Sequence, residues 1–452
     1  MARVGGWIGG VAALVVAASA GIGPLAAAEE RVAERVFLVR DKPGTPAQFR
    51  MLVLAGCSDE ADGQCKGLAH YLEHLVLVGR NPEHKEIAIR FFPDASSNGT
   101  TSMRATTYIH TVPAREAGPK ADLEQLFAFY AARLKDFSIR EDEAARERNV
   151  VLQEHDWRVG SSPFRRFDRR LDRELMPDHP SGLWTIGTRE SIQSLTLADA
   201  KAFHRNWYAV NNVYFLVKAD IDAKDLKEIA ERALAGLEAK RLPPRPVARQ
   251  IELTLERKDY READAQVERA GVIYKKLVRI EDGEAIEARA ARAVLSSYLR
   301  SRLPGSPHQA LVEVGKLASS TPFVGLDRVA PKTFMLRIGA DVAPDVAPQA
   351  LLAAIGGYVD AMAGSVPSPE QVDRLKRRIA DGRANEDQDP AMVYNRLIGW
   401  LSNRNAYEEY ASWPQRLADV SHADVARTAG LLAGPGRIVT GTMVPAGEDA
   451  GK

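Results

Sequence analysis

The stretch Gly67-Leu68-Ala69-His70-Tyr71-Leu72-Glu73-His74 has the pattern of a helix that carries a metal site. Residues four apart share one face of a helix, so His70 and His74 can present two ring nitrogens to one metal ion. Glu73 borders the same face, where its carboxylate can reach a water on the metal without being a ligand itself. This H-x-x-E-H order is the thermolysin-type zinc motif in reverse. The stretch therefore predicts a zinc site with Glu73 as a catalytic residue.

The residues around the motif are mostly apolar, namely Leu68, Ala69, Leu72, Leu75, Val76 and Leu77. A surface helix with two ordinary histidines on its polar face is the alternative interpretation. Two histidines and a glutamate on a largely buried helix need polar partners, and a metal ion supplies them. The flanking residues therefore favour the metal site.

A catalytic zinc ion takes three protein ligands and leaves a fourth position for water. The third ligand must come from elsewhere, and Glu147 and Glu154 are the best candidates. They are seven positions apart, which places both carboxylates on one face of a helix. Spacing alone fits a solvated charged helix at least as well, with Arg146 and Arg148 as ion-pair partners. The residues by themselves leave the third ligand open.

Together these residues resemble the pitrilysin/insulinase-type (M16) zinc metallopeptidases. The likeness is to short members of the family, such as the mitochondrial processing peptidase and its bacterial relatives. It rests on His70-x-x-Glu73-His74 followed by a glutamate 80 positions past His74. The resemblance implies that Glu154 is the third ligand of one Zn²⁺ per chain. It also implies that Glu147 is a carboxylate that holds the ligands and polarises the site.

A second match is Asn98-Gly99-Thr100-Thr101-Ser102, which resembles the family's Asn-Ala-x-Thr edge strand beside the metal. In relatives the peptide substrate adds to this strand through backbone hydrogen bonds. The resemblance therefore implies that Asn98, Gly99 and Thr101 bind substrate. Gly99 replaces the family's alanine and keeps room for the substrate backbone. The implied function is a zinc-dependent endopeptidase that acts on extended or unfolded peptides, with Glu73 as the general base.

The second half of the chain departs from the family. Many members carry an arginine and a tyrosine there that hold the substrate, and Leu311–Ser319 is the corresponding stretch. It contains no arginine, and Ser319 stands where tyrosine is expected. We expect either a homologous M16-type partner subunit that supplies the pair, or a homodimer with substrate anchored through Arg300 or Arg302. A non-catalytic peptide-binding or scaffold subunit is the alternative function, although such relatives usually lose the zinc ligands.

Repeated segments indicate an internal duplication. Ser194–Asp199 has the pattern of a helix start, and Val420–Val425 repeats it 225 positions later. Strand-like runs follow both, at Asn212–Val217 and at Arg437–Val444. The pattern predicts an α+β fold of two homologous α/β sandwich domains, each with helices packed on one face of a mixed sheet.

The proline-rich stretch Leu242–Pro246 marks the linker between the two domains. The predicted division is a zinc-binding domain at 29–237, a linker at 238–248 and a second domain without the zinc motif at 249–446. Within the first domain, Val36–Arg40 and Arg50–Ala55 are expected to form two paired strands. Thr100–Val112 is expected to form one long strand.

The composition is that of a soluble globular protein: 452 residues, of which 45% are hydrophobic and 27% are charged. It excludes a disordered chain, a collagen-like chain and a polytopic membrane protein. There are 61 lysines and arginines against 60 aspartates and glutamates, for a net charge of +1. Such a balance gives no long-range attraction to nucleic acid, so no nucleic-acid partner is expected.

The first 28 residues have the pattern of a cleavable secretory signal. Arg3 is the only charge before Glu29, and the apolar run between them ends in Ala26-Ala27-Ala28. An uncleaved anchor is the alternative, because the run is long enough to span a bilayer. Glycines and Pro24 weaken a spanning helix. We expect a periplasmic or otherwise exported protein with no stable membrane span after cleavage.

The chain has two cysteines, Cys57 and Cys65, eight positions apart. In the oxidising compartment that the signal predicts, such a pair can form a disulfide across one loop. Two reduced thiols are the alternative.

Overall fold

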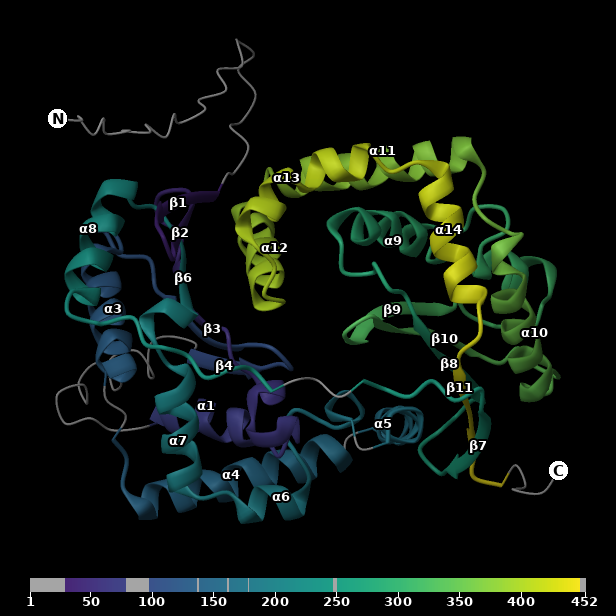
Figure 1. Cartoon of the computed structure of the whole chain (residues 1–452), viewed down its shortest axis with the longest axis horizontal. Coiled ribbons are helices and arrows are strands. Elements are labelled where there is room, and N and C mark those ends of the chain that lie inside the picture. Colours follow the sequence, from purple (N-terminus) through teal and green to yellow (C-terminus); the bar gives the residue numbers. More distant parts are fainter. Residues whose placement is uncertain are drawn as a thin grey trace, which may run out of the picture.

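Two mixed β-sheets, each with its own set of helices, form the structure (Figure 1). It is a computed structural model that describes residues 29–78, 97–135, 138–160, 162–177, 179–246 and 250–447. The predicted signal segment, residues 1–28, lies outside the described residues. The predicted α+β class with two sandwich-like halves is confirmed. Among the described helices, none combines the length and the apolar character that crossing a membrane requires.

The first sheet has six strands in the order β1-β2-β6-β3-β5-β4. Their bounds are β1 Glu29–Ala33, β2 Val36–Arg40, β3 Ala47–Val53, β4 Ser97–Thr101, β5 Thr106–Val112 and β6 Val213–Ala219. β2 runs parallel to β6, and the other neighbours are antiparallel. The expected pairing of β2 with the next strand is wrong, because β6 returns from far along the chain and lies between them.

The expected single strand at Thr100–Val112 is also wrong. β4 and β5 form a hairpin instead, and the turn between them is closed by hydrogen bonds from the Ser102 amide (2.8 Å) and hydroxyl (3.0 Å) to the Ala105 carbonyl. This turn makes β4 an edge strand with only β5 as its neighbour.

The second sheet repeats the first without the extra strand β1. Its order is β7-β11-β8-β10-β9. β7 runs parallel to β11, as β2 does to β6 in the first sheet, and the other neighbours are antiparallel. The bounds are β7 Arg257–Asp264, β8 Gly271–Arg279, β9 Phe323–Ala330, β10 Thr333–Asp341 and β11 Arg437–Pro445. The equal order and directions support the predicted duplication.

Helices cover one face of each sheet in the same sequence order. In the first half they are α1 Leu68–Val78, α3 Lys120–Lys135, α4 Glu141–Gly160, α6 Arg189–Ser194, α7 Leu197–Trp207 and α8 Ala223–Leu234. In the second half they are α9 Ile286–Leu299, α10 Pro348–Asp360, α11 Pro369–Glu386, α13 Tyr407–Ala418 and α14 His422–Ala433. The repeated segments do start equivalent helices, since Thr196 caps α7 and Ser421 caps α14, each in a capping box.

The remaining face of each sheet is covered by a helix from the other half. α12, Pro390–Ser402, packs Leu397 and its neighbours against Phe37 and Leu216 of the first sheet. α5, Pro163–Leu175, packs Leu171 and its neighbours against Leu277 of the second sheet. This exchange, visible in Figure 1, interlocks the two halves. The described part of the predicted linker, residues 238–246, has neither helix nor strand.

Candidate metal centre

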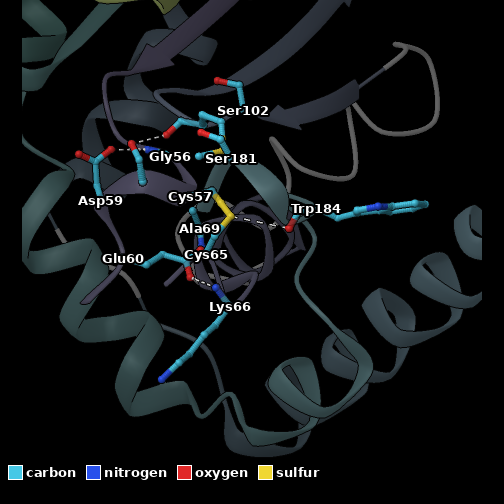
Figure 2. Close-up of a disulfide and its surroundings, with 12 residues drawn as sticks. Gly56, Cys57, Asp59, Glu60, Cys65, Lys66, Ala69, Ser102, Ser181 and Trp184 are labelled. Atoms are coloured by element: carbon cyan, nitrogen blue, oxygen red, sulfur yellow. Dashed lines mark hydrogen bonds between the residues drawn. A yellow bond between two sulfur atoms is a disulfide. The ribbon is translucent and has the colours of Figure 1, made fainter. Parts of the chain in front are cut away.

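The loop before α1 fixes the helix that carries the H-x-x-E-H residues. Cys57 and Cys65 form a disulfide across this loop, as the sequence suggested (Figure 2). Glu60 lies between them, and its buried carboxylate accepts hydrogen bonds from the amides of Lys66 and Ala69 at the start of α1. Burial raises the pKa of Glu60 to about 7, although these amide donors oppose the shift. A carboxylate at a helix N-terminus satisfies amides that have no partner inside the helix.

His70, His74 and Glu154 are brought together from α1 and α4. The Oε2 atom of Glu154 lies 3.4 Å from Nε2 of His70 and 3.4 Å from Nε2 of His74. Three donor atoms, one from each residue, lie within 4.8 Å of one another. α4 presents Glu154 to the histidines because it packs directly against α1.

The donor atoms of this cluster fit a zinc ion. Among the described residues, Glu154 Oε2 is buried and has no hydrogen-bond partner. A buried carboxylate oxygen without a partner is costly, and a cation between it and the two imidazoles would remove that cost. Two histidines and one carboxylate are a donor set of catalytic zinc sites. Although burial opposes it, the two histidines and Arg158 lower the pKa of Glu154 to about 2, so the carboxylate is ionised and able to bind a cation.

Glu147 lies behind His74, on the side away from Glu154. Its Oε2 atom is 3.5 Å from Nδ1 of His74, so the carboxylate can orient the ring while Nε2 faces the metal position. Burial opposes it, but the carboxylates of Glu147 and Glu154 raise the pKa of His74 to about 9. Burial, together with the neighbouring His74 charge, lowers the pKa of His70 to about 3.

Glu73 faces the edge strand β4. The Thr101 hydroxyl donates a hydrogen bond of 2.6 Å to Oε2 of Glu73, whose residue is only 3% exposed. Burial raises the pKa of Glu73 to about 7, although this hydrogen bond lowers it. A Cβ atom on Gly99 would lie 2.3 Å from Oε1 of Glu73. Gly99 therefore makes room for the Glu73 carboxylate, which is a different role from the expected one toward substrate.

A cavity of about 550 Å³ joins these residues. It is lined by His70, Glu73, His74, Asn98, Gly99, Thr100, Thr101, Val150, Glu154 and Arg158. All three expected substrate-binding residues thus border the metal cluster. Sequence reasoning missed Arg158, whose guanidinium pairs with Oε1 of Glu154. Its place four residues after Glu154, on the same helix face, was the signal that could have identified it.

The described part of the second half has no comparable cluster of metal-binding side chains. Its helix α9 occupies the position of α1, and residues such as Ala291, Val294 and Leu295 pack into the core there. Arg300, an expected alternative anchor for substrate, donates from Nε to the Val324 carbonyl of β9 at 2.9 Å.

Each half of the chain matches its own family model. Residues 35–178 match the family model described as insulinase (peptidase family M16). Residues 194–379 match the model described as the peptidase M16 inactive domain. The chain belongs to the M16 peptidase family.

Relatives of this M16 chain include proteases of bacteria and of mitochondria. Zinc protease PqqE of Helicobacter pylori is 30% identical over 200 residues, 43% of this chain and 43% of that protein. The probable zinc protease PqqL of Escherichia coli is 28% identical over 214 residues, 44% of this chain and 21% of that protein. The probable mitochondrial-processing peptidase subunit beta of Schizosaccharomyces pombe is 29% identical over 174 residues, 38% of this chain and 36% of that protein. The chain spans less than half the length of these relatives.

Solved structures share the fold over nearly the whole M16 chain. A protease from Helicobacter pylori superposes with a TM-score of 0.72 at 22% identity, over 91% of this chain and 97% of that one. The periplasmic protease PqqL from Escherichia coli gives 0.71 at 19% identity, over 93% of this chain and 48% of that one. These similarities establish the two-sheet architecture.

Proposed function

We propose that the chain is an exported zinc-dependent endopeptidase that hydrolyses extended or unfolded peptides. The observation that carries this proposal is the buried, unpartnered Oε2 of Glu154, 3.4 Å from one nitrogen of each histidine and next to a buried Glu73. Export is supported by the N-terminal signal pattern, by the Cys57–Cys65 disulfide and by the periplasmic relative PqqL.

His70, His74 and Glu154 would hold the zinc ion, with Glu147 orienting His74. When bound there, zinc lowers the pKa of a water molecule and polarises the scissile carbonyl. Glu73 accepts a proton from the attacking water and delivers it to the leaving nitrogen. The hydrogen bond from Thr101 holds one oxygen of Glu73 and leaves the other for this transfer.

The substrate would bind along β4, which has a neighbour on one side only. A peptide that adds to this edge by backbone hydrogen bonds passes Asn98, Gly99 and Thr101, beside Glu73. Backbone pairing selects extended chains with little dependence on sequence. This accounts for a preference for unfolded segments over folded domains.

A partner would complete the substrate site. Leu311–Ser319 lacks the family's arginine and tyrosine, so a homologous M16-type subunit supplies them or a homodimer anchors the peptide through other groups, such as Arg302. The same lack favours a second candidate function, a non-catalytic peptide-binding subunit.

The test is peptide hydrolysis by the purified protein and by Glu73→Gln, with bound zinc measured in both. Wild type should bind about one zinc per chain and cleave, while Glu73→Gln keeps zinc and loses about a hundredfold or more in rate. The matched control is Glu141→Gln, an exposed residue of α4 outside the cavity, which should behave as wild type. Zinc without cleavage in wild type would indicate that a partner subunit is required or that the chain is the non-catalytic subunit, and addition of the partner separates these two outcomes. No zinc in any form would contradict the metal site and the peptidase function.

A further inference from the structure

A larger cavity, of about 1320 Å³, lies between the two halves at the N-terminal end of α1. The first half contributes the turn after β4 and the C-terminal part of α5, and the second half contributes the end of β9 and the residues after α12. Its walls carry seven lysine and arginine side chains against three carboxylates. The whole chain is nearly neutral, so this excess of positive charge is local.

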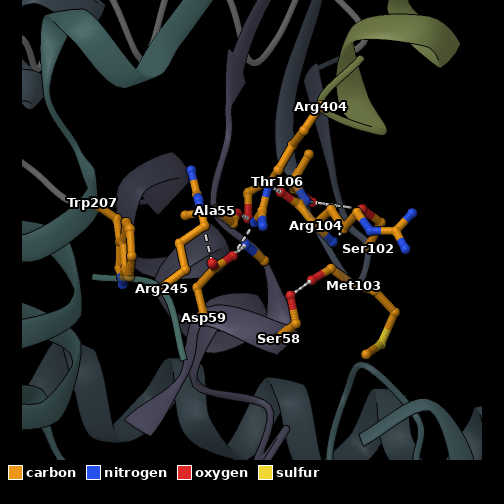
Figure 3. Close-up of polar contacts among 12 residues, drawn as sticks. Ala55, Ser58, Asp59, Ser102, Met103, Arg104, Thr106, Trp207, Arg245 and Arg404 are labelled. Carbon is orange, nitrogen blue, oxygen red and sulfur yellow. Dashed lines mark hydrogen bonds and ion pairs between the residues drawn. The ribbon is translucent and has the colours of Figure 1, made fainter. Parts of the chain in front are cut away.

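The three carboxylates of the wall already have partners. Asp59, only 4% exposed, is bound by Arg245 at 2.6 Å and by Arg404 (Figure 3). Glu284 pairs with Arg328, and Glu174 accepts a hydrogen bond from the Tyr260 hydroxyl. Asp59 and Glu284 are thus paired with arginines of the wall, and the single charge of Glu174, which is hydrogen-bonded to a neutral hydroxyl, still leaves the seven cations in excess.

Three of the cations, in contrast, have no carboxylate partner among the described residues: Lys66, Arg104 and Arg173. Arg104 is half-buried, and within the described ranges its guanidinium donates only to the neutral amide oxygen of Asn403, at 3.2 Å. Burial, and then the charges of Arg328 and Arg404, lower the pKa of Arg104 to about 10. A partly desolvated cation among other cations is destabilising until an anion joins it.

Consecutive residues at the end of β4 line the candidate metal centre and this cavity. Thr101 lines the smaller cavity beside Glu73, and the next three residues, Ser102, Met103 and Arg104, line the larger one. Ser102–Ala105 form the turn at the end of β4. A peptide that is paired with β4 and continues past Thr101 runs toward this turn at about 3.3 Å per residue, so its next few residues reach the side chains of the turn, Arg104 included. Side chains of that part of the peptide would enter the positively charged cavity.

We propose that this cavity is a subsite for acidic side chains of the peptide, and that Arg104, Lys66 and Arg173 bind their carboxylates. The position of the subsite relative to a cleaved bond rests on the proposed peptidase function. The binding of carboxylates by the subsite does not depend on that function. The substrates it selects are extended peptides with aspartate or glutamate a few residues from the cleaved bond.

The test uses pairs of peptides blocked at both ends, in which two glutamates are present or replaced by glutamines. The glutamates are placed on one side of the cleaved bond in one series and on the other side in a second series. Binding to the Glu73→Gln protein is measured by fluorescence anisotropy, and kcat/KM is measured with the active protein. One series should show about tenfold tighter binding of the acidic peptide, falling as salt is raised.

Arg104→Gln should reduce that preference to about twofold or less and leave the glutamine peptide unchanged. Arg173→Gln, an exposed position of α5 whose loss does not threaten folding, should reduce it in part. The matched control is Arg205→Gln, an exposed arginine of α7 outside the cavity, which should keep the full preference.

Equal binding of acidic and neutral peptides by wild type would overturn the subsite. So would an equal loss for both peptides in Arg104→Gln, since that result indicates a structural role. The experiment distinguishes a failure of the subsite proposal from a failure of the peptidase proposal. Cleavage without acidic preference contradicts only the subsite, whereas Arg104-dependent binding without cleavage contradicts only the peptidase function.

Discussion

Helices α1 and α9 follow equivalent strands, β3 and β8, and pack on equivalent faces of their sheets, yet their buried residues differ in kind. α1 buries His70 and Glu73, at 5% and 3% exposure, whereas α9 buries alanine, valine, leucine and tyrosine. In the described second half, no carboxylate oxygen or imidazole nitrogen is buried without a partner, while the first half has Glu154 Oε2 and His70 Nδ1. The duplicated fold does not need these polar groups, so their presence in one half indicates function.

The largest expected effect is the stabilisation by zinc, which should bind to the first half and not to the second. Zinc added to metal-free protein, at a thousandfold excess over its Kd, should stabilise the first half by about 4 kcal/mol. Because the halves are interlocked, exchange through global opening should slow in both, whereas exchange through local opening should slow in α1 and α4 and stay unchanged in their counterparts α9 and α11. Glu154→Gln should abolish the response. Equal slowing of local exchange in α9 and α11 would contradict a site confined to the first half.

The next effect tests the exchange of helices between the halves. Leu171 of α5 and Leu397 of α12 are fully buried against the sheet of the other half. Leu171→Ala and Leu397→Ala should each lower the free energy of unfolding by about 3 kcal/mol, through lost burial and a cavity. Denaturant unfolding with a probe in each half checks this. A substitution that destabilises only one half would show that the halves are not interlocked.

A third comparison uses a glycine on each edge strand. Gly99→Ala places a methyl group 2.3 Å from Oε1 of Glu73, so the carboxylate must move. A displaced general base should lower kcat by about a hundredfold while zinc stays bound. On β9, Gly325→Ala meets only the ends of Arg337 and Asp327 at 3.3 Å and should leave kcat unchanged. Equal rates for the two variants would remove Gly99 from the positioning of Glu73.

The smallest expected effect is a pH dependence of stability that comes from Glu60. The Glu60 carboxylate accepts hydrogen bonds at the start of α1, whereas α9 has no side-chain cap in the equivalent place. Burial raises its pKa from 4.5 to about 7, so the folded state binds more protons than the unfolded state between these values. Stability should therefore fall as pH rises from 4.5 to 7, by about 1 kcal/mol per unit from this group. Glu60→Gln should flatten that slope in unfolding measured across the range. An unchanged slope would assign it to other groups.

Local patterns in the sequence were enough for the two histidines and Glu73 and for the duplication, whereas Glu154 was assigned only through the family resemblance. His70, Glu73 and His74 are close in sequence on one helix, and Thr196 and Ser421 form local caps, so both can be recognised without tertiary information. The insertion of β6 between β2 and β3, and the exchange of α5 and α12, depend on contacts far apart in sequence. The contact of Gly99 with Glu73 and that of Arg104 with Arg404 also join residues far apart in sequence, so local patterns do not reveal them.

The central claim is that the first half alone holds zinc, between α1 and α4. Anomalous diffraction at the zinc edge from crystals of the zinc-loaded protein tests it most directly. The account predicts one strong peak per chain, about 2.0–2.2 Å from one nitrogen of each of His70 and His74 and from a carboxylate oxygen of Glu154. A peak elsewhere, or no peak at these three residues, would contradict it.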